Sequence, residues 1–236
     1  MDAPTDLPDP RSWVIYQDED ILVINKPAGL LSVADGYHQG LPHLSQVLEP
    51  FFGIVWMVHR LDKNTSGTML VARNSVSHRQ LNFQFRERQV QKLYHCLVTP
   101  APVWQEIIMN EPLLMNADRA HRTRVNFEKG KPAETRARVI LHAGQIAMLE
   151  CEILTGYTHQ IRAHLYHQGI RILGDCLYQP NRADLSPAQA SPPRMMLHAR
   201  QLTFLHPVTG RKMDFTAEYP LDFSEYLRQI QAHSPG

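Results

Sequence analysis

The stretch TRARVILHAGQIAMLECEIL at residues 135–154 indicates the fold class that the rest of the chain follows. Apolar residues alternate along residues 135–141 and dominate residues 146–154, and a four-residue link containing Gly144 joins the two runs. Period-two alternation is typical of strands, and a short link with glycine is typical of a hairpin. The stretch therefore predicts two antiparallel strands.

Similar signals predict further short strands and a few inserted helices. Strands are expected at residues 13–17, 21–25, 67–72, 91–99, 201–205 and 213–217, and helices at residues 42–52, 74–88, 158–168 and 222–232. Strands joined mainly by short turns indicate an α+β fold with a mixed, largely antiparallel central sheet and flanking helices. We expect one domain over residues 1–236, with residues 1–12 flexible and residues 175–194 forming a surface loop.

The composition excludes several classes of protein. Hydrophobic residues make up 43% of the 236 residues, which excludes wholesale disorder. No apolar run approaches the length of a membrane span, and the acidic, proline-containing start lacks the features of a signal peptide, so a cytoplasmic location is expected. Three scattered cysteines argue against a disulfide scaffold and a cysteine-built zinc site.

The charges are unevenly distributed although the formal net charge is only +1. Residues 59–138 hold 14 Lys and Arg against seven Asp and Glu, and half of these basic residues lie in residues 119–138. A basic region inside a nearly neutral chain indicates a polyanion bound on one face, although a solvated surface gives the same charge pattern. Arg122 and Arg124 are the candidate contacts to nucleic-acid phosphates within this region.

The segment HRLDKNTSG at residues 59–67 is the most distinctive local motif. It predicts a tight loop that presents the carboxylate of Asp62 between basic residues and ends at a glycine. Asp62 is a candidate nucleophile or general base, whereas an isolated loop aspartate more often stabilises a turn. A kinase catalytic loop is rejected because the order is H-R-L-D and no glycine-rich phosphate loop precedes it.

A second motif, TGYTHQIRAHL at residues 155–165, predicts a helix capped by Thr158. Ile161 and Leu165 face the core, and Arg162 lies about 100° around the helix from Ile161, where it can reach a buried carboxylate. The nearby histidines match no metal-binding spacing, so no metal is expected. Tyr94 lies in a predicted strand, on the same side as its apolar neighbours.

These motifs together resemble the RluA-type pseudouridine synthases. The family pattern contains, in order, a KPAG-like turn, HRLDxxTSG, KxY, TGRTHQIR, GDxxY and LHAxxLxxxHP. The counterparts here begin at residues 26, 59, 92, 155, 174 and 197, and the resemblance covers residues 13–220. Tyr157 stands where the family usually has arginine. The chain is similar to the short, single-domain branch, which lacks an S4-like RNA-binding domain.

The resemblance implies a role for each matched residue. Asp62 is expected to be the catalytic aspartate, Arg162 to pair with it, and Tyr94 to stack on the target uracil. Ile161 is expected to contact the base, and Arg60 to fill the space left by the flipped nucleotide.

The resemblance also implies an RNA pseudouridine synthase that acts on large-subunit ribosomal RNA, transfer RNA or both. The isomerisation involves no redox change or net group transfer, so no cofactor or metal is expected, and the chain is expected to be a monomer. Two alternatives are an RNA-binding module with a silent site and a hydrolase or transferase that uses Asp62 with a histidine. The intact set of Asp62, Arg162 and Tyr94 argues against the first, and the lack of a nucleophile elbow or paired carboxylates argues against the second.

Overall fold

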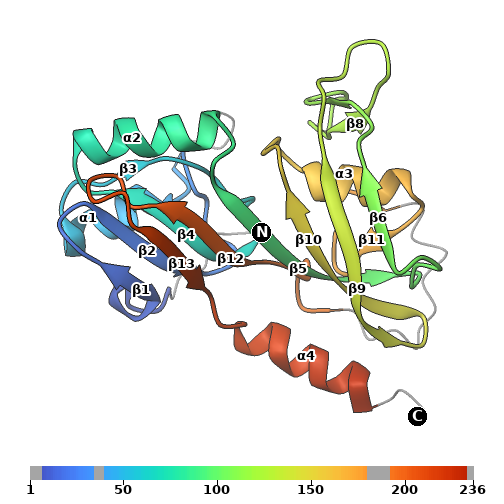
Figure 1. The fold of residues 1–236 in the computed structure, drawn as a ribbon. Coiled ribbons are helices and arrows are strands. Elements are labelled where there is room, and N and C mark those ends of the chain that lie inside the picture. Colours follow the sequence, from blue (N-terminus) through green and yellow to red (C-terminus); the bar gives the residue numbers. More distant parts are fainter. Residues whose placement is uncertain (1–6, 35–39, 180–191, 233–236) are drawn as a thin grey trace. The chain divides into compact units, whose positions relative to one another are not determined.

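A computed structural model of the chain describes residues 7–34, 40–179 and 192–232. The chain divides into unit 1, residues 1–92 and 199–219, and unit 2, residues 93–198 and 220–236. Figure 1 traces the elements of each unit. The expectation of one catalytic domain over residues 1–236 stays a prediction. None of the helices in the described part of the chain has the length and apolar character to cross a bilayer.

Unit 1 contains a sheet in which the strand order is β1, β2, β4 and β12, with β3 paired to β4 and β13 paired to β12. The ladders β1–β2, β2–β4, β3–β4 and β12–β13 are all antiparallel. The elements are η1 (Pro10–Trp13), β1 (Val14–Gln17), β2 (Ile21–Lys26), α1 (Leu44–Phe52), β3 (Trp56–Met57), β4 (Ser66–Ala72), α2 (Ser75–Arg86), β12 (Leu197–Leu205) and β13 (Lys212–Thr216). Strand β12 enters this unit at Ala199.

The core of unit 1 lies around β2 and β4. Every residue of β4 is buried, as are five of the six residues of β2, because both faces of these inner strands are covered. Helix α2 adds Leu81 to the same cluster, which also holds Val58, Leu70 and Phe204. The side chain of Asn74 caps this helix by accepting a hydrogen bond from Ser77 N–H at 2.9 Å, which decides between Asn74 and Ser75, the two caps that the sequence allows.

Unit 2 contains a sheet in which the strand order is β5, β10, β9 and β6, with β11 paired to β5. The four ladders are antiparallel, and β7 and β8 form a separate antiparallel hairpin. The elements are β5 (Gln91–Thr99), β6 (Glu106–Met109), β7 (Leu113–Leu114), β8 (Arg124–Val125), β9 (Thr135–Ala143), β10 (Ile146–Ile153), α3 (Gln160–His167), β11 (Arg171–Ile172) and α4 (Leu221–Ala232). The α+β fold with a largely antiparallel sheet is confirmed.

The hairpin predicted at residues 135–154 forms from β9 and β10. Its register runs from Ile146 opposite Ala143 to Ile153 opposite Thr135. Gly144 in the turn has φ +61°, a left-handed conformation that glycine adopts without steric cost.

Helix α3 begins two residues later than the sequence predicts. His159 precedes its first residue in a left-handed conformation with φ +58°, so the prediction that Thr158 caps the helix is wrong. The carbonyl oxygen of Thr158 instead accepts a hydrogen bond from the hydroxyl of Thr123 at 2.7 Å. The backbone of Thr158, the residue expected to cap the helix, is therefore held by a hydrogen bond from a residue distant in sequence.

Two segments predicted to be irregular make specific contacts where the structure describes them. Asp175 and Tyr178 are almost fully buried, so the predicted surface loop over residues 175–194 is wrong at its start. Residues 180–191 of that loop lie outside the described residues. At the other end of the chain, Asp9 caps η1 through the backbone N–H of Arg11. Residues 1–6 of the segment expected to be flexible lie outside the described residues, and that expectation stays a prediction.

Candidate active site

The loop that carries Asp62 lies in unit 1, between β3 and β4. The carboxylate is partly exposed, and its backbone carbonyl accepts a hydrogen bond from Thr65 N–H at 3.0 Å. The preceding residue, Leu61, is buried, and both of its backbone groups form hydrogen bonds with the hydroxyl of Ser32. This hydroxyl donates to the Leu61 carbonyl at 2.7 Å and accepts from the Leu61 N–H at 3.0 Å. The backbone before and after Asp62 is therefore held in place by the protein.

The KPAG turn at residues 26–29 anchors the same loop. Lys26 is fully buried, and its ammonium donates to the carbonyl of Thr65 at 3.0 Å and to that of Pro27 at 2.7 Å. The Gly29 N–H donates to the carbonyl of Lys63 at 2.8 Å. The sequence analysis assigned this turn no role beyond its place in the family pattern, and its contacts show that it holds the carbonyl groups that follow Asp62.

Gly67 ends the loop where two strands approach closely. A methyl group at this position would lie 2.2 Å from the carbonyl oxygen of Ala199, and φ is +118°. A side chain cannot be accommodated there, which explains the glycine at the end of HRLDKNTSG.

His59 supports the loop as a neutral hydrogen-bond acceptor. Its Nε2 accepts from the Leu70 N–H at 2.9 Å, and its ring stacks on Phe85 with centroids 4.7 Å apart. Burial, with a smaller contribution from the positive charge of Lys92, lowers the pKa of His59 to about 3. An imidazole whose Nε2 is occupied by a backbone donor is poorly suited to act as a base, which argues against the hydrolase alternative.

Arg162 lies in unit 2 and forms a buried, two-pronged ion pair with Asp175. Its Nε and Nη2 donate to the two carboxylate oxygens at 2.7 and 2.9 Å, and the side chains are 8% and 1% exposed. The guanidinium also lies 4.9 Å from the ring centroid of Tyr178. Bidentate geometry of this kind fixes the orientation of the guanidinium as well as its charge.

The expectation that Arg162 reaches a buried carboxylate is thus confirmed, and one such carboxylate is Asp175. Its pairing with Asp62, which belongs to unit 1, stays a prediction. Sequence reasoning missed Asp175, although the GDxxY motif at residues 174–178 was the signal that contained it. Gly174 in this motif has φ +73°, and a methyl group there would lie 1.9 Å from the carbonyl oxygen of Arg194.

A buried polar network attaches α3 to the strands beneath it. Gln160 Nε2 donates to the hydroxyl of Thr135 at 3.0 Å and to the carbonyl of Glu134 at 2.9 Å. His164 is fully buried, with Nδ1 2.9 Å from the Thr135 hydroxyl and Nε2 3.0 Å from the Glu111 carbonyl. Burial lowers the pKa of His164, which favours its neutral form, and both ring nitrogens contact the protein.

The two residues expected to contact the base are buried, and the residue expected to fill the space left by the flipped nucleotide is exposed. Tyr94 is 8% exposed and lies on β5 on the same side as Cys96 and Val98, as predicted. Ile161 is 4% exposed on α3, whereas Arg60 is exposed in the Asp62 loop. The roles of these three residues toward RNA stay predictions.

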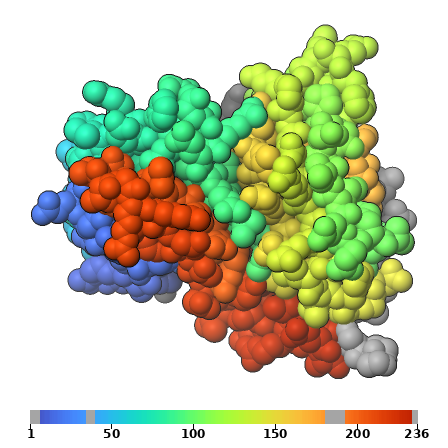
Figure 2. All heavy atoms as spheres, viewed as in Figure 1, coloured from blue at the N-terminus to red at the C-terminus, as the bar shows by residue number. Residues whose placement is uncertain are grey.

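Arg122 and Arg124 lie in or beside the β7–β8 hairpin of unit 2 and share one carboxylate. Asp118 Oδ2 is 2.8 Å from Nε of Arg122 and 2.9 Å from Nη2 of Arg124. Burial opposes ionisation of Asp118, but hydrogen bonds, the first from Arg122, lower its pKa overall. Figures 1 and 2 show this yellow-green segment at one end of unit 2. Both arginines are therefore oriented by the protein.

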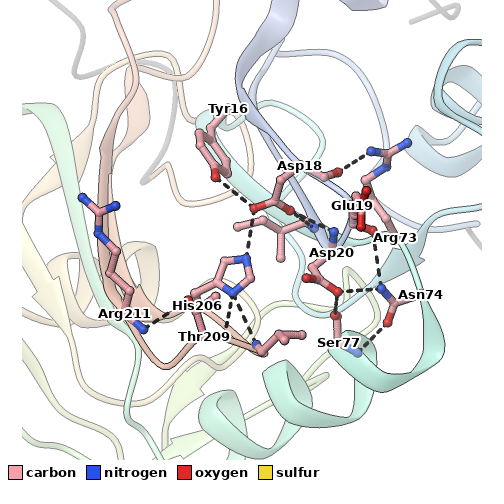
Figure 3. A network of polar contacts seen from close by, with 12 residues as sticks. Tyr16, Asp18, Glu19, Asp20, Arg73, Asn74, Ser77, His206, Thr209 and Arg211 are labelled. Carbon is pink, nitrogen blue, oxygen red and sulfur yellow. Dashed lines mark hydrogen bonds and ion pairs between the residues drawn. The ribbon is translucent and has the colours of Figure 1, made fainter.

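Unit 1 also contains a group of side chains with metal-ligand chemistry, formed by Asp18, Asp20 and His206 (Figure 3). The Nδ1 of His206 lies 3.3 and 3.2 Å from the backbone N–H groups of Val208 and Thr209, and its Nε2 is 3.0 Å from Asp18. The imidazole therefore carries its proton on Nε2 and donates it to the carboxylate. That nitrogen is occupied by the protein.

The remaining carboxylate of this group also accepts hydrogen bonds from protein donors. Asp20 accepts hydrogen bonds from the Asn74 amide at 2.8 Å and from the Ser77 hydroxyl at 2.9 Å (Figure 3). The network ties the β1–β2 turn to the start of α2 and to the β12–β13 turn. It explains His206, the histidine of the last motif, as a structural residue of unit 1.

Comparison with known proteins identifies the class of enzyme. The description RNA pseudouridylate synthase belongs to the family profile that matches residues 20–167. The chain belongs to this family of isomerases that act on RNA, which confirms the RluA-type resemblance.

Individual relatives match over most of the chain. The dual-specificity RNA pseudouridine synthase RluA of Escherichia coli strain K12 is 37% identical over 219 residues, covering 92% of this chain and 97% of that protein. The ribosomal large subunit pseudouridine synthase C of Vibrio cholerae is 34% identical over 219 residues, covering 92% and 69%. The structure of human RNA pseudouridylate synthase domain containing 4 matches with a TM-score of 0.78 and 26% identity over 94% of each chain.

Proposed function

We propose that this chain isomerises uridine to pseudouridine in structured RNA, with large-subunit ribosomal RNA, transfer RNA or both as substrate. Family membership supports the reaction. The name of the Escherichia coli relative describes dual RNA specificity, and that of the Vibrio cholerae relative describes the large ribosomal subunit. A cytoplasmic location and a monomeric state are part of the same proposal, and size-exclusion chromatography with light scattering tests the second.

Asp62 is proposed as the carboxylate that attacks or deprotonates the sugar. The reaction breaks the N1–C1′ bond, rotates the base and forms a C5–C1′ bond, after which the C5 proton is released to solvent and N1 gains a proton. Because atoms and electrons balance within the nucleotide and water, no cofactor or metal is required. Arg162 is proposed to favour the ionised form of Asp62, since an opposite charge stabilises a carboxylate.

The observation that carries this proposal is the support beneath the Asp62 loop. Burying an ammonium group is costly unless it is well hydrogen-bonded. Lys26 is nonetheless fully buried, and it donates to the carbonyl of Thr65, three residues after Asp62. The protein therefore uses the buried charge of Lys26 to fix the Asp62 loop. This supports a catalytic role for Asp62, because such a role depends on the position of its carboxylate.

Base flipping is proposed to bring the target uridine to Asp62. Extruding a stacked nucleotide costs a few kcal/mol, and stacking on an aromatic ring returns roughly 1–3 kcal/mol per base. Tyr94 is proposed to provide that ring and Ile161 an apolar contact to the base. Arg60, which is exposed, is proposed to occupy the vacated stack.

Substitution of Asp62 by asparagine tests the proposal. Asp62→Asn keeps the size of the side chain and removes its charge, so release of tritium from RNA labelled at uridine C5 is expected to fall to background while RNA binding persists. Asp214→Asn, at an exposed carboxylate on β13 of the same unit, serves as the matched control and should retain activity. Undiminished tritium release by Asp62→Asn would overturn the assignment of Asp62.

The alternative function is a catalytically silent RNA-binding module of the same fold. It predicts that the wild-type chain binds RNA but releases no tritium from any ribosomal or transfer RNA substrate. The same assay, run with both RNA classes and with EDTA, therefore separates the two functions and tests the expected independence from metal.

A further inference from the structure

Tyr178 connects two elements of the proposed site that are far apart in sequence, and both belong to unit 2. The side chain is 2% exposed, so its ring and its hydroxyl are both committed to the protein interior. The sequence places it at the end of the GDxxY motif, and neither the proposed reaction nor the base contacts use it.

The ring of Tyr178 lies against Arg162. The guanidinium carbon is 4.9 Å from the ring centroid, while Asp175 grips the same guanidinium through Nε and Nη2. Asp175 Oδ1 also accepts from the backbone N–H groups of Leu177 and Tyr178, at 2.9 and 3.2 Å. The Asp175 carboxylate and the Tyr178 ring therefore contact the Arg162 guanidinium together and fix the orientation of its plane.

The hydroxyl of Tyr178 holds the backbone of Thr123. It accepts from the Thr123 N–H at 2.7 Å and donates to the Thr123 carbonyl at 2.9 Å. Thr123 is 1% exposed and lies between Arg122 and Arg124. The Tyr178 hydroxyl thus forms hydrogen bonds with both backbone groups of Thr123, the residue between the two arginines.

Apolar contacts reinforce this connection. Tyr178 shares a buried cluster with Ala133, with Leu113 of β7 and with Ala163 of α3. Val125 of β8 packs against that cluster. The hairpin that precedes β9, the helix that carries Arg162 and the GDxxY segment therefore share one small core.

We propose that Tyr178 is a positioning residue, which holds the Arg122–Arg124 segment and the Arg162 guanidinium in a fixed mutual arrangement through its hydroxyl and its ring. This inference rests on the proposed function, in which Arg162 supports Asp62 and the arginine segment binds RNA phosphates. RNA that docks on the segment then meets a site already organised for reaction. Loss of such pre-organisation appears as weaker binding, because the segment must be ordered when RNA binds.

The hydroxyl of Tyr178 and the support of Arg162 by Asp175 can be tested separately by substitution. Tyr178→Phe keeps the ring against Arg162 and removes both hydrogen bonds to Thr123, so KM for RNA is expected to rise roughly tenfold with kcat within about twofold of wild type. Asp175→Asn weakens the grip on Arg162 and leaves the hydroxyl in place, so kcat is expected to fall roughly tenfold or more with little change in KM. Tyr166→Phe, at a 39% exposed tyrosine of α3 whose ring lies 5.8 Å from that of Tyr178, is the matched control.

A combined variant tests whether the hydroxyl acts through the arginine segment. When Arg122→Gln and Arg124→Gln are already present, adding Tyr178→Phe should change KM by less than twofold. A structural defect elsewhere would instead multiply the two effects. Steady-state tritium release at varied RNA concentration gives kcat and KM for every variant.

Three outcomes decide the inference. Wild-type protein without turnover refutes the proposed function, whereas wild-type turnover with an unchanged KM in Tyr178→Phe refutes the positioning role. If Tyr178→Phe does not fold, hydrogen exchange of the Thr123 amide in the wild-type protein takes its place. Protection of the Thr123 amide comparable to that of the β9 amides supports the hydrogen bonds between Tyr178 and Thr123, and rapid exchange of this amide overturns the inference.

Discussion

Buried charges in this chain are oriented by partners from distant parts of the sequence. Arg162 and Asp175 are 13 residues apart, and the ammonium of Lys26 donates to a carbonyl 39 residues away. Such groups are costly to bury unpaired, so removing one partner destabilises the other. Their positions are therefore restricted by the chemistry of the pair as well as by side-chain volume.

At this residue scale, we expect Arg162→Lys to lose most activity even though it keeps the positive charge. A lysine ammonium cannot reproduce the planar fork that bonds both oxygens of Asp175, so kcat is expected to fall roughly tenfold or more. Arg162→Ala should lose more, because Asp175 is then buried without its cation. Tritium release measures the activity of both variants, and circular dichroism confirms folding. Full activity in Arg162→Lys would show that planar geometry is dispensable.

At the scale of elements, the β7–β8 hairpin concentrates candidate phosphate contacts on a short, well-anchored segment. Arg122 and Arg124 bond to Asp118, and Thr123 between them is clamped by Tyr178. The strands themselves contain two residues each, too few for any periodic signal. Tertiary contacts, more than intrinsic strand propensity, hold this segment.

We expect the double variant Arg122→Gln/Arg124→Gln to bind RNA more weakly and with a shallower salt dependence. Each lost phosphate contact reduces the slope of log affinity against log salt by about 0.7 on single strands, so a change of about 1.4 is expected. The kcat at saturating RNA should stay nearly unchanged, because the two residues are not proposed to touch the reacting atoms. Fluorescence anisotropy at several salt concentrations measures the slope.

Two controls isolate this effect. Arg211→Gln/Lys212→Gln removes equal charge from exposed positions of unit 1 and should leave the slope unaltered. In the hairpin variant Asp118 has lost both arginine partners, and its negative charge can repel RNA phosphates. Adding Asp118→Asn removes this charge, so it distinguishes the loss of arginine contacts to RNA from this repulsion. A hairpin variant with the wild-type slope would move the RNA contacts to another element, such as the basic helix α2.

At the scale of the whole molecule, each unit has its own buried polar network as well as its own apolar core. In unit 1, His206, Asp18 and Asp20 tie two turns to the start of α2, and His59 fixes the backbone of β4. Burial lowers the pKa of His59 and of His164, which favours the neutral form of both histidines in the folded protein. Folding therefore competes with protonation of these groups in the unfolded chain.

We expect the free energy of unfolding to fall when the pH is lowered from 7.5 to 5.5. The pKa of His59 is about 3 in the folded protein and about 6.5 unfolded, so its stabilising effect is complete above pH 6.5 and is lost as the pH falls toward 3. The loss by pH 5.5 is about 1.4 kcal/mol for this one residue. Urea unfolding at the two pH values measures it.

His59→Gln should reduce this pH dependence by about the same 1.4 kcal/mol, because glutamine does not titrate. His142→Gln, at an exposed position of β9, is the matched control and should retain the wild-type dependence. An unchanged difference between the two pH values in His59→Gln would mean that His59 does not stay neutral in the folded protein.

The sequence by itself determined the features that depend on neighbouring residues. Period-two alternation placed β5 at residues 91–99 with Tyr94 on its buried side, and capping residues at 74 and 75 marked the start of α2 to within one residue. The loop presenting Asp62 and the turn at Gly144 follow from local composition in the same way. Strand alternation, capping and turn chemistry act over a few residues, so they can be read along the chain.

Only the tertiary structure decided which distant groups meet. The carboxylate gripping Arg162 is Asp175, the left-handed His159 replaces Thr158 as the residue before α3, and Tyr178 clamps Thr123 across 55 residues of chain. Each outcome depends on the packing of elements against one another, and a local pattern contains no information about which remote partner is available. Buried polar groups must nevertheless find partners when water is excluded, and for that physical reason the fold determines these pairings.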